Sequence, residues 1–467
     1  MKEQHYLAFD CGNSSLRTVV GRFDGHKIEL EVLRQVPNQE FRGVRFDHWN
    51  ILSIFHELLR GMEQACSLYP DITTFGISTW GIDFGLIGAS GDLLGNPLSY
   101  RNSVGMRGMK QKSSRELEQL FQQTGIQNLP MNSLYQLLGI RALMPEYLQQ
   151  AHKVLLTPDL LNYLFTGEMN TEISIASTTE LLDMRRRDYS DEVLSAHELD
   201  KNLFAPLVGH GKKRGVLKEE LQKLYDIPPL IAVSVPSHDT ASAVASVPSE
   251  HENSLWISSG TWSLIGTVVD EPIINRQVME AGFSNEGGLH GAITLLKNSA
   301  GMHLMQRIKR ELEAEKGEKV SWDQLVAMAQ ASKKGSRISF DVNDESLYHP
   351  VSMMQAIGKL TKLNSNEDII ASAYYALAHS YEQALSALQQ IIGKQYNTLH
   401  IIGGGSQNSH VNALTASLTG MKVLAGPVEA TSMGAIAAQL MYTHPQMSVE
   451  SLRSVMRNSC NTIEYEP

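Results

Sequence analysis

Apolar and polar positions near the start of the chain predict three short strands, over residues 6–10, 16–23 and 28–36. The turn Asp24-Gly25 joins the last two, so we expect an antiparallel meander. From Trp49 onward the apolar residues take the spacing of one helix face, and the buried strand TFGIST follows. A meander, a helix and a strand in this order predict the beginning of an α/β domain.

The middle of the chain repeats this layout. The stretch LIAVSVPSHDTASAVASV predicts a strand, a polar turn and a helix of small residues, and SLWISSGTWSLIGTVV then predicts a strand, a small polar turn and a second strand. We interpret the second hairpin as a diverged copy of the first. The polar segment ASVPSEHEN separates them, so we expect two domains, residues 1–245 and 246–467.

The second half predicts further α/β structure. A charged helical region extends over 302–331, and DIIASAYYALAHSYEQALSALQQII keeps helical spacing, which predicts that Tyr374 and Tyr381 lie in the core. LHIIGGGSQNS then predicts a strand that ends in glycines, with helices and a strand after it. A strand, a glycine-rich turn and a helix are typical of nucleotide-binding domains.

Composition narrows the class of protein. The 467 residues carry a formal charge of −10 without basic clusters, which argues against a nucleic-acid partner. Cys11, Cys66 and Cys460 form no CxxC pair and favour a reducing compartment. The start lacks an apolar leader, and no run reaches the roughly 18 apolar residues of a membrane span. We therefore expect a cytoplasmic protein with no membrane partner.

The turns suggest how a phosphate group could be bound. The motif GxxxxGK[ST] does not occur. The motif GxGxxG does not occur either, because in GGGSQN the last glycine of that motif is replaced by Asn408. Two hairpin turns, 10–15 and 258–263, remain as candidates to hold a polyphosphate. Asp10, at the end of the first strand, could hold the accompanying Mg²⁺. The alternative for Asp10 is a residue that only initiates the turn.

Two more segments offer candidate chemistry. Asp239, in SHDT after the strand LIAVSV, could accept a proton from an attacking hydroxyl, or it could only cap the following helix. His238 could bond a sugar hydroxyl or be a satisfied histidine. In STWGIDFGL, Gly81 permits close approach of a ligand and Trp80 offers an apolar face to a sugar ring, although a buried tryptophan beside a bulge is the alternative.

Six segments, taken in order, resemble the FGGY carbohydrate kinases, most closely the rhamnulokinase and L-fuculokinase branch. They are FDCGNSSLR, ISTWGIDF, SHDTASAV, SSGTWSL, LKNSAG and GGGSQN. The resemblance extends over nearly the whole chain, because it also includes the segments NSLYQL, TPDLLNYLFTG, NEGG and AGPVEATSMGAIAAQLM. It implies two actin-like, ribonuclease H-like ATPase domains of the α/β class, with a catalytic cleft between them where ATP and sugar meet.

The resemblance also implies residue roles. Asp239 matches the general base, and Asp10 matches the Mg²⁺ position. The sugar-contacting positions are Gly81, His238, Asp239 and Asn298. The ATP-contacting positions are Asn13, Ser14, Ser15, Leu16, Arg17, Thr261, Gln306, Gly403, Gly404 and Gly405.

The implied reaction is ATP-dependent phosphorylation of the C1 hydroxyl of a 6-deoxy-ketohexose, either L-rhamnulose or L-fuculose. Two alternatives stay open: a kinase of a xylulose-like ketose or polyol in the same family, and a catalytically silent sugar or nucleotide sensor on the same scaffold. The expected partner is a small-molecule sugar, and the expected assembly is a monomer or homodimer.

Overall fold

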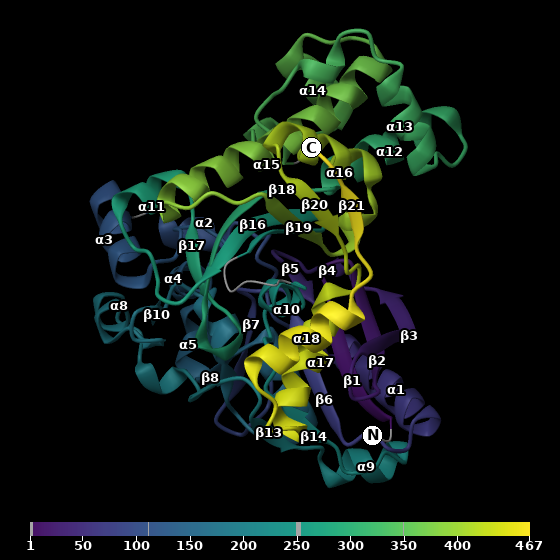
Figure 1. Ribbon diagram of the computed structural model, residues 1–467. Helices are drawn as coiled ribbons and strands as arrows, with labels where there is room; N and C mark the ends of the chain where they lie inside the picture. Colours follow the sequence, from purple (N-terminus) through teal and green to yellow (C-terminus); the bar gives the residue numbers. More distant parts are fainter. Residues whose placement is uncertain (1–2, 111, 249–253, 349) are drawn as a thin grey trace. The chain divides into compact units, whose positions relative to one another are not determined.

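The computed structural model describes residues 3–110, 112–248, 254–348 and 350–467 (Figure 1). The chain forms two compact units, each built from several segments. The first unit comprises Met1–Glu250, Val268–Leu295 and Glu429–Cys460, and the second comprises His251–Thr267, Leu296–Val428 and Asn461–Pro467.

The first unit is organised around a six-stranded sheet in the order β13-β14-β6-β1-β2-β3. Its strands are β1 (Gln4–Cys11), β2 (Ser15–Phe23), β3 (Ile28–Pro37), β6 (Thr74–Thr79), β13 (Lys213–Val216) and β14 (Ile231–Val233). The predicted meander is confirmed, because β1 pairs antiparallel with β2 and β2 with β3. Strand β6, the predicted TFGIST strand, lies parallel to β1, and β14 lies parallel to β6.

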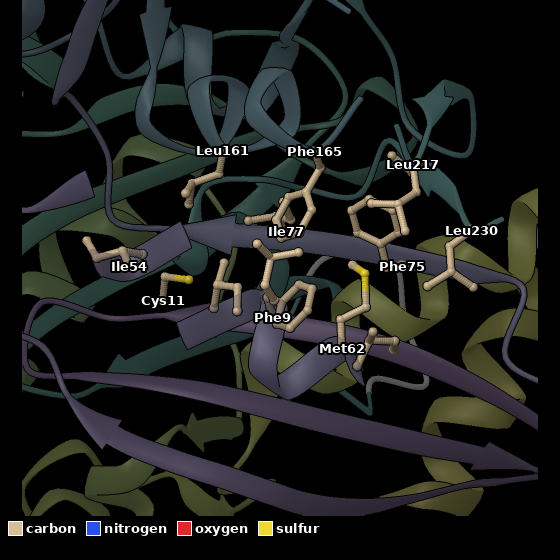
Figure 2. Packing of buried hydrophobic residues seen from close by; sticks show 14 of the residues in the cluster. Phe9, Cys11, Ile54, Met62, Phe75, Ile77, Leu161, Phe165, Leu217 and Leu230 are labelled. Atoms are coloured by element: carbon tan, nitrogen blue, oxygen red, sulfur yellow. The ribbon is translucent and has the colours of Figure 1, made fainter. Parts of the chain in front are cut away.

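Helices cover both faces of this sheet because side chains of β1 alternate between them. Phe9 and Cys11 point to one face, where they pack with residues of α1 (Ile51–Leu68) and α6 (Thr157–Thr166), as Figure 2 shows. Tyr6 and Ala8 point to the other face and pack with α17 (Ala430–Thr443) and α18 (Val449–Ser459), drawn in yellow in Figure 1. The last helices of this unit therefore complete the core around its first strand.

The remaining elements of the first unit surround the sheet or form small pairs of strands. They are β4 (Glu40–Arg42), β5 (Asp47–Trp49), β7 (Phe84–Gly88), α2 (Val104–Met109), α3 (Ser114–Thr124), α4 (Ser133–Leu143), α5 (Pro145–Gln150), β8 (Ala151–Leu156), β9 (Thr171–Glu172), α7 (Ile173–Ser177), β10 (Leu182–Asp183), β11 (Asp188–Tyr189), α8 (Asp191–Ala196), β12 (Leu207–Val208), α9 (Glu219–Tyr225), α10 (Asp239–Ala245) and α11 (Arg276–Ala281).

A second sheet has seven strands in the order β17-β18-β16-β15-β19-β20-β21. They are β15 (Leu255–Ser259), β16 (Trp262–Val269), β17 (Ser284–Gly287), β18 (Ile293–Ala300), β19 (Thr398–Ile402), β20 (Lys422–Ala425) and β21 (Ile463–Tyr465). The helices of the second unit are α12 (His303–Lys316), α13 (Trp322–Gln330), α14 (Met353–Thr361), α15 (Asn366–Ile392) and α16 (Ser409–Thr419). As in the first sheet, an antiparallel hairpin, β15–β16, has a parallel strand, β19, beside its first strand.

Most elements predicted for the second half are confirmed, and the structure adds a break within the charged helical region. The long helix is α15, and Tyr374 and Tyr381 are fully buried on it, as its spacing predicts. The charged region over 302–331 is two helices, α12 and α13. Gly317 ends α12 in the left-handed conformation, and the Ser321 side chain caps α13, so the helix cannot continue through this segment.

Two further features bear on the class of protein. All three cysteines are free thiols. Among the described residues, no helix has both the length and the apolar character needed to cross a membrane.

The contact between α10 and α17 depends on a glycine. A Cβ atom on Gly434 of α17 would lie 1.8 Å from the carbonyl oxygen of Ser242 on α10. We expect Gly434→Ala to lower the free energy of unfolding by about 1–3 kcal/mol, the usual cost of overpacking. Urea denaturation measures this change, and Gly209→Ala is the matched control because a Cβ there meets no atom within 4 Å. Equal stabilities of the two variants would contradict the prediction.

Candidate active site

Asp10 ends β1 as a buried carboxylate that belongs to a chain of three charges. One guanidinium nitrogen of Arg17, Nη1, lies 3.1 Å from Asp10 Oδ2 and also 3.1 Å from Glu429 Oε2. Burial raises the pKa of Asp10 to about 6, the charges of Asp239 and Glu429 add to this, and the Arg17 charge opposes it. The carboxylate of Asp10 therefore lies close to two other carboxylates, with one partly shared cation.

The turn after β1 presents its backbone amides rather than its carbonyls. Asn38 donates from its side chain to the Gly12 carbonyl (2.9 Å) and from its backbone to the Ser14 carbonyl (3.0 Å). In the described part of the chain, the N–H groups of Asn13 and Ser14 make no hydrogen bond, and Arg17 Nε and Asn13 Oδ1 are buried without a partner. Free amides and an unused guanidinium N–H are groups that phosphate oxygens can accept from.

Two of the sequence-predicted residues in this hairpin lie differently from their neighbours. Leu16 is buried in the core cluster on the α1 face of the sheet, so its side chain is not available to a ligand. Ser14 is exposed at the tip of the turn. Within the hairpin, any contact of Leu16 with ATP would have to come from its backbone.

Asp239 begins α10, and a buried glutamate fixes the segment before it. Glu172 accepts hydrogen bonds from the Ser237 backbone N–H (2.9 Å) and the Ser174 hydroxyl (2.6 Å). Ser174 in turn accepts a hydrogen bond from the His238 backbone N–H at 3.2 Å. Burial opposes ionisation of Glu172, but His210 at 2.7 Å and these hydrogen bonds outweigh it and lower its pKa. The backbone that presents His238 and Asp239 is thus held by a charged, fully buried side chain.

The His238 ring lies between two carboxylates. Its Nδ1 is 3.0 Å from Glu286 Oε2, without hydrogen-bond alignment, and its Nε2 is 3.5 Å from Asp239 Oδ1. Burial alone would lower the pKa of His238, but the charges of Glu286 and Asp239 raise it above its ordinary value. The ring can therefore carry a positive charge beside Asp239 near neutral pH.

Asp239 combines access with an environment that favours proton uptake. Its side chain is 32% exposed. Partial burial of the carboxyl group raises its pKa, and the charge of His238 and a hydrogen bond from Thr240 oppose that rise. A carboxylate with a raised pKa is a better proton acceptor than an ordinary aspartate at the same pH. The first unit thus places Asp10 and Asp239 close enough for their charges to interact.

The surroundings of Asp10 decide whether this residue can hold Mg²⁺. Among the residues that the structure describes, no three His, Cys, Asp or Glu side chains are grouped as a metal site. Oδ1 of Asp10 accepts no hydrogen bond in that same part of the chain, whereas Oδ2 faces Arg17. One free carboxylate oxygen beside unused phosphate-binding groups fits Mg²⁺, which usually takes one or two carboxylates and completes its shell with water and phosphate oxygens.

Gly81 follows the end of β6, next to the segment that carries His238. The Thr79 backbone N–H donates to the Ser237 carbonyl at 2.8 Å, and Thr79 pairs with His238 in a parallel bridge. A Cβ on Gly81 would lie 3.2 Å from the side chain of Thr178. Trp80 is buried against Trp49, with ring centroids 4.3 Å apart, so the alternative of a buried tryptophan is the one that the structure supports.

Asp83 holds these two tryptophans in place. Oδ2 accepts hydrogen bonds from Trp49 Nε1 (2.6 Å) and Trp80 Nε1 (3.0 Å), and Oδ1 accepts one from Gln136 Nε2 (3.1 Å). Burial raises the pKa of Asp83 to about 7, and the three donors oppose this. Each of these side-chain donors bonds to a carboxylate oxygen of Asp83, and these hydrogen bonds fix the segment that carries Gly81 against the core.

We expect Asp83→Asn to lower the free energy of unfolding by about 1–3 kcal/mol, because the new NH₂ group must face one of three hydrogen-bond donors. Gln136 cannot easily turn away, since its amide also donates to the Met131 carbonyl at 2.8 Å. Urea denaturation at pH 8 measures the loss. The exposed Asp92→Asn is the control, and a midpoint for Asp83→Asn equal to that of Asp92→Asn would refute the argument.

The second unit contains a turn of the same kind. The Gly260 carbonyl accepts from the Met302 N–H (2.9 Å), and the Thr261 carbonyl accepts from the His303 N–H (3.2 Å). The side chain of Thr261 makes no hydrogen bond in the described part of the chain. Gln306 lies one turn into α12, which follows directly, and Asn298 is exposed on β18. In both units, neighbouring amides hold turn carbonyls, which leaves Asn13, Ser14 and Thr261 available.

The three glycines after β19 differ in what they do. Gly403 has a φ of 82° and donates its N–H to the Pro427 carbonyl at 2.9 Å. A Cβ on Gly405 would lie 2.0 Å from the Ser259 hydroxyl, so this glycine is needed for packing against β15. Gly404 is exposed and a Cβ there would meet no atom within 4 Å. Of the three glycines, Gly404 is the one whose surroundings leave most room for a ligand.

Three glutamates were not predicted as site residues. Glu286 lies in NEGG and Glu429 in AGPVEATSMG, both parts of the resemblance, but nothing in their spacing assigns them partners. Glu172 lies in none of the motifs that carry the resemblance. Their roles depend on contacts such as that of Arg17 with Glu429, which are 412 positions apart in the sequence.

Comparison with solved structures shows the class to which this fold belongs. The chain aligns over 100% of its length with 94% of a gluconate kinase from Lactobacillus acidophilus, with a TM-score of 0.83 and 15% identity. A xylulose kinase from the same organism gives a TM-score of 0.83 at 16% identity, with 99% of this chain and 94% of that chain covered. The fold is thus the α/β fold of sugar kinases, with two sheets.

Sequence comparison places the chain within that class. The FGGY family of carbohydrate kinases matches with its N-terminal domain at residues 5–246 and with its C-terminal domain at residues 255–443. A rhamnulokinase from Bacteroides thetaiotaomicron is 34% identical, covering 100% of this chain and 96% of the relative, and one from Bacillus subtilis is 32% identical, covering 97% and 93%. The chain belongs to the FGGY family of carbohydrate kinases and is an ATP-dependent sugar kinase.

Proposed function

We propose that this kinase transfers the γ-phosphoryl group of ATP to the C1 hydroxyl of L-rhamnulose. The observation that carries the substrate is the similarity over nearly full length to proteins named rhamnulokinase. L-Fuculose, the alternative 6-deoxy-ketohexose, has no support from these relatives. The accessible carboxylate of Asp239, with its raised pKa, supports the proposal that this residue takes the proton of the attacking hydroxyl.

In the proposed mechanism, Asp239 accepts the proton of the C1 hydroxyl as its oxygen attacks the γ-phosphorus in line. His238, held beside Asp239 and Glu286, donates a hydrogen bond to a sugar hydroxyl and keeps the sugar oriented. Gly81 and Asn298 are the other proposed sugar contacts. Glu172 acts through the backbone by fixing the segment that carries the base.

Phosphate binding is assigned to the two turns. We propose that ATP contacts Asn13, Ser14, Ser15, Leu16 by its backbone, Arg17, Thr261, Gln306, Gly403, Gly404 and Gly405. Asp10 is the residue that would hold Mg²⁺, whose chemistry when bound is to neutralise charge on the phosphates. We further propose a functional division into residues 1–245, with the base, the first phosphate hairpin and most sugar contacts, and residues 246–467, with the remaining ATP contacts and Asn298.

The test is ADP release by the purified protein with Mg·ATP and each of five acceptors: L-rhamnulose, L-fuculose, L-fructose, D-xylulose and glycerol. L-Rhamnulose and L-fuculose differ in configuration at C4, so kcat/KM for the pair isolates recognition of that centre. The expected result is the highest kcat/KM with L-rhamnulose. A rejected C4 epimer implies that a buried hydrogen-bonding group is left unpaired.

Other outcomes lead to other conclusions. Highest activity with L-fuculose, D-xylulose or glycerol would keep the family and overturn the substrate. ATP hydrolysis that no sugar accelerates would favour the sensor alternative, for which no residue in the site argues, since Asp10 and Asp239 are both present.

A further inference from the structure

A polar hollow of about 480 Å³ lies in the second unit, lined by β18, by residues 339–343 and by α15. Both labelled elements can be found in Figure 1. Lys297 and Ser299 line it, and because side chains alternate along a strand, they point to the opposite side of β18 from Asn298. None of the residues proposed to bind ATP or sugar lines this hollow. Its volume is within the range of small-molecule sites.

One residue that lines the hollow, Ser299, has a buried hydroxyl without a partner. Ser299 is only 3% exposed, and its Oγ makes no hydrogen bond in the described structure. Buried polar atoms of this kind are nearly always satisfied in folded proteins, so the atom points to a bound group. The apolar cluster of Ala300, Val342 and Ala376 lies alongside and gives the hollow a rigid wall.

Lys297 supplies an unpaired cation at the same place. In the described part of the chain its ammonium group makes no hydrogen bond or ion pair, and burial lowers its pKa while the charge of Asp341 opposes that change. An ammonium group and an unsatisfied hydroxyl on the same face of one strand can both donate hydrogen bonds to an oxyanion.

The other polar groups suit hydroxyls rather than more negative charge. Asp341 and Gln383 are exposed and line the same hollow. His379 Nδ1 lies 3.0 Å from the Ser339 hydroxyl, which can donate to it and leave the proton on Nε2. The charges of Lys297 and Asp341 nearly cancel, so the hollow is a poor match for a polyanion such as a nucleoside triphosphate. Acceptors and donors together match the hydroxyl groups of a sugar derivative.

We propose that this hollow binds a small hydroxylated anion of the sugar-phosphate or sugar-acid class, with the oxyanion on Lys297 and Ser299 and the hydroxyls on Asp341 and Gln383. The site is separate from the residues of phosphoryl transfer. It would let a carbohydrate metabolite bind to the kinase without competing for the catalytic residues.

Isothermal titration calorimetry on the full chain carrying Asp239→Asn, with saturating Mg·ADP, tests this without turnover. The probes are D-glucose 6-phosphate, D-gluconate, inorganic phosphate and uncharged D-glucose. We expect saturable binding of D-glucose 6-phosphate or D-gluconate that is tighter than that of D-glucose. D-glucose 6-phosphate and D-gluconate show whether the hollow prefers a phosphate or a carboxylate as the oxyanion. The difference in affinity between D-glucose 6-phosphate and inorganic phosphate measures the contribution of the sugar hydroxyl groups.

Variants locate the binding. Lys297→Met should weaken it by about 10–100-fold, as expected for loss of a charged hydrogen bond, and Ser299→Ala should weaken it by several-fold. Lys334→Met, outside the hollow, is the matched control, and unchanged Mg·ADP affinity shows that each variant is folded. Binding that both variants leave unchanged, or no binding of any probe at about 10 mM, would overturn the proposal. So would a crystal structure in which an ordered water alone satisfies Ser299 in the presence of the probes. None of these results depends on which sugar the kinase phosphorylates.

Discussion

Asp239→Asn is expected to lower kcat with sugar and Mg·ATP by about 10²–10⁴-fold, the range for loss of a general base. The amide has nearly the shape of the carboxylate but cannot accept the proton of an attacking hydroxyl. Because the backbone of this segment is held by Glu172 and Ser174, the substitution should leave the sugar site in place. The KM for sugar should therefore change far less than kcat, and steady-state ADP release measures both.

The pH profile adds a second readout. The raised pKa of Asp239 means that wild-type kcat/KM should begin to fall on the acid side at a higher pH than for an ordinary aspartate. Asp239→Asn should lose this dependence along with the rate. The exposed Asp92→Asn should behave as the wild type. A turnover number in Asp239→Asn equal to that of the wild type would reject the assignment of the base.

Local patterns explain why much of the fold could be predicted. Strands β1, β2 and β3 are specified by short apolar stretches that turn residues interrupt, and helix α15 is specified by helical spacing, from which the burial of Tyr374 and Tyr381 follows. The division of the charged region into α12 and α13 depends on one glycine and one serine cap. Helical periodicity depends on many positions at once, so it does not reveal an interruption made by one or two residues.

Long-range contacts explain why the rest could not. The sequence places Asp10 at a strand end, but it contains no sign that Arg17 bridges it to Glu429. His238 likewise meets Glu286 from a strand 48 positions later along the sequence. The side-chain donors on Asp83 come from segments as distant as Trp49 and Gln136. These contacts set the electrostatics of the site, and only the folded chain brings them together.

Asp10 illustrates how such contacts create a requirement for a cation. Its pKa is raised to about 6 by burial and by two nearby carboxylates, whereas in an unfolded chain it would stay near the ordinary aspartate value of 3.8. The folded state thus binds the proton more tightly, so the contribution of this group to stability is greatest at low pH and is lost as the pH rises from about 4 to 6. A divalent cation would relieve the repulsion that remains above pH 6.

We therefore expect Asp10→Asn to lower kcat/KM for Mg·ATP by about 10²–10³-fold, as for other losses of a charge-stabilising group. The variant should not have a lower Tm than the wild type at pH 8, since a neutral amide removes a buried charge. Mg²⁺ should raise the Tm of the wild type but not that of Asp10→Asn. This readout does not depend on activity.

The pH dependence separates this account from a purely structural role. In the wild type, the apparent affinity for Mg²⁺ at fixed ATP should fall below about pH 6, because a proton competes for the Asp10 carboxylate. Asp10→Asn should show a flat profile over the same range, with Asp92→Asn as the control. A residue that only initiates the turn would give the opposite pattern: Asn also favours turns, so activity and Mg²⁺ affinity would survive the substitution. Since Oδ1 of Asp10 is the oxygen left free by Arg17, retention of Mg²⁺ binding in the variant would move the metal site away from β1 altogether.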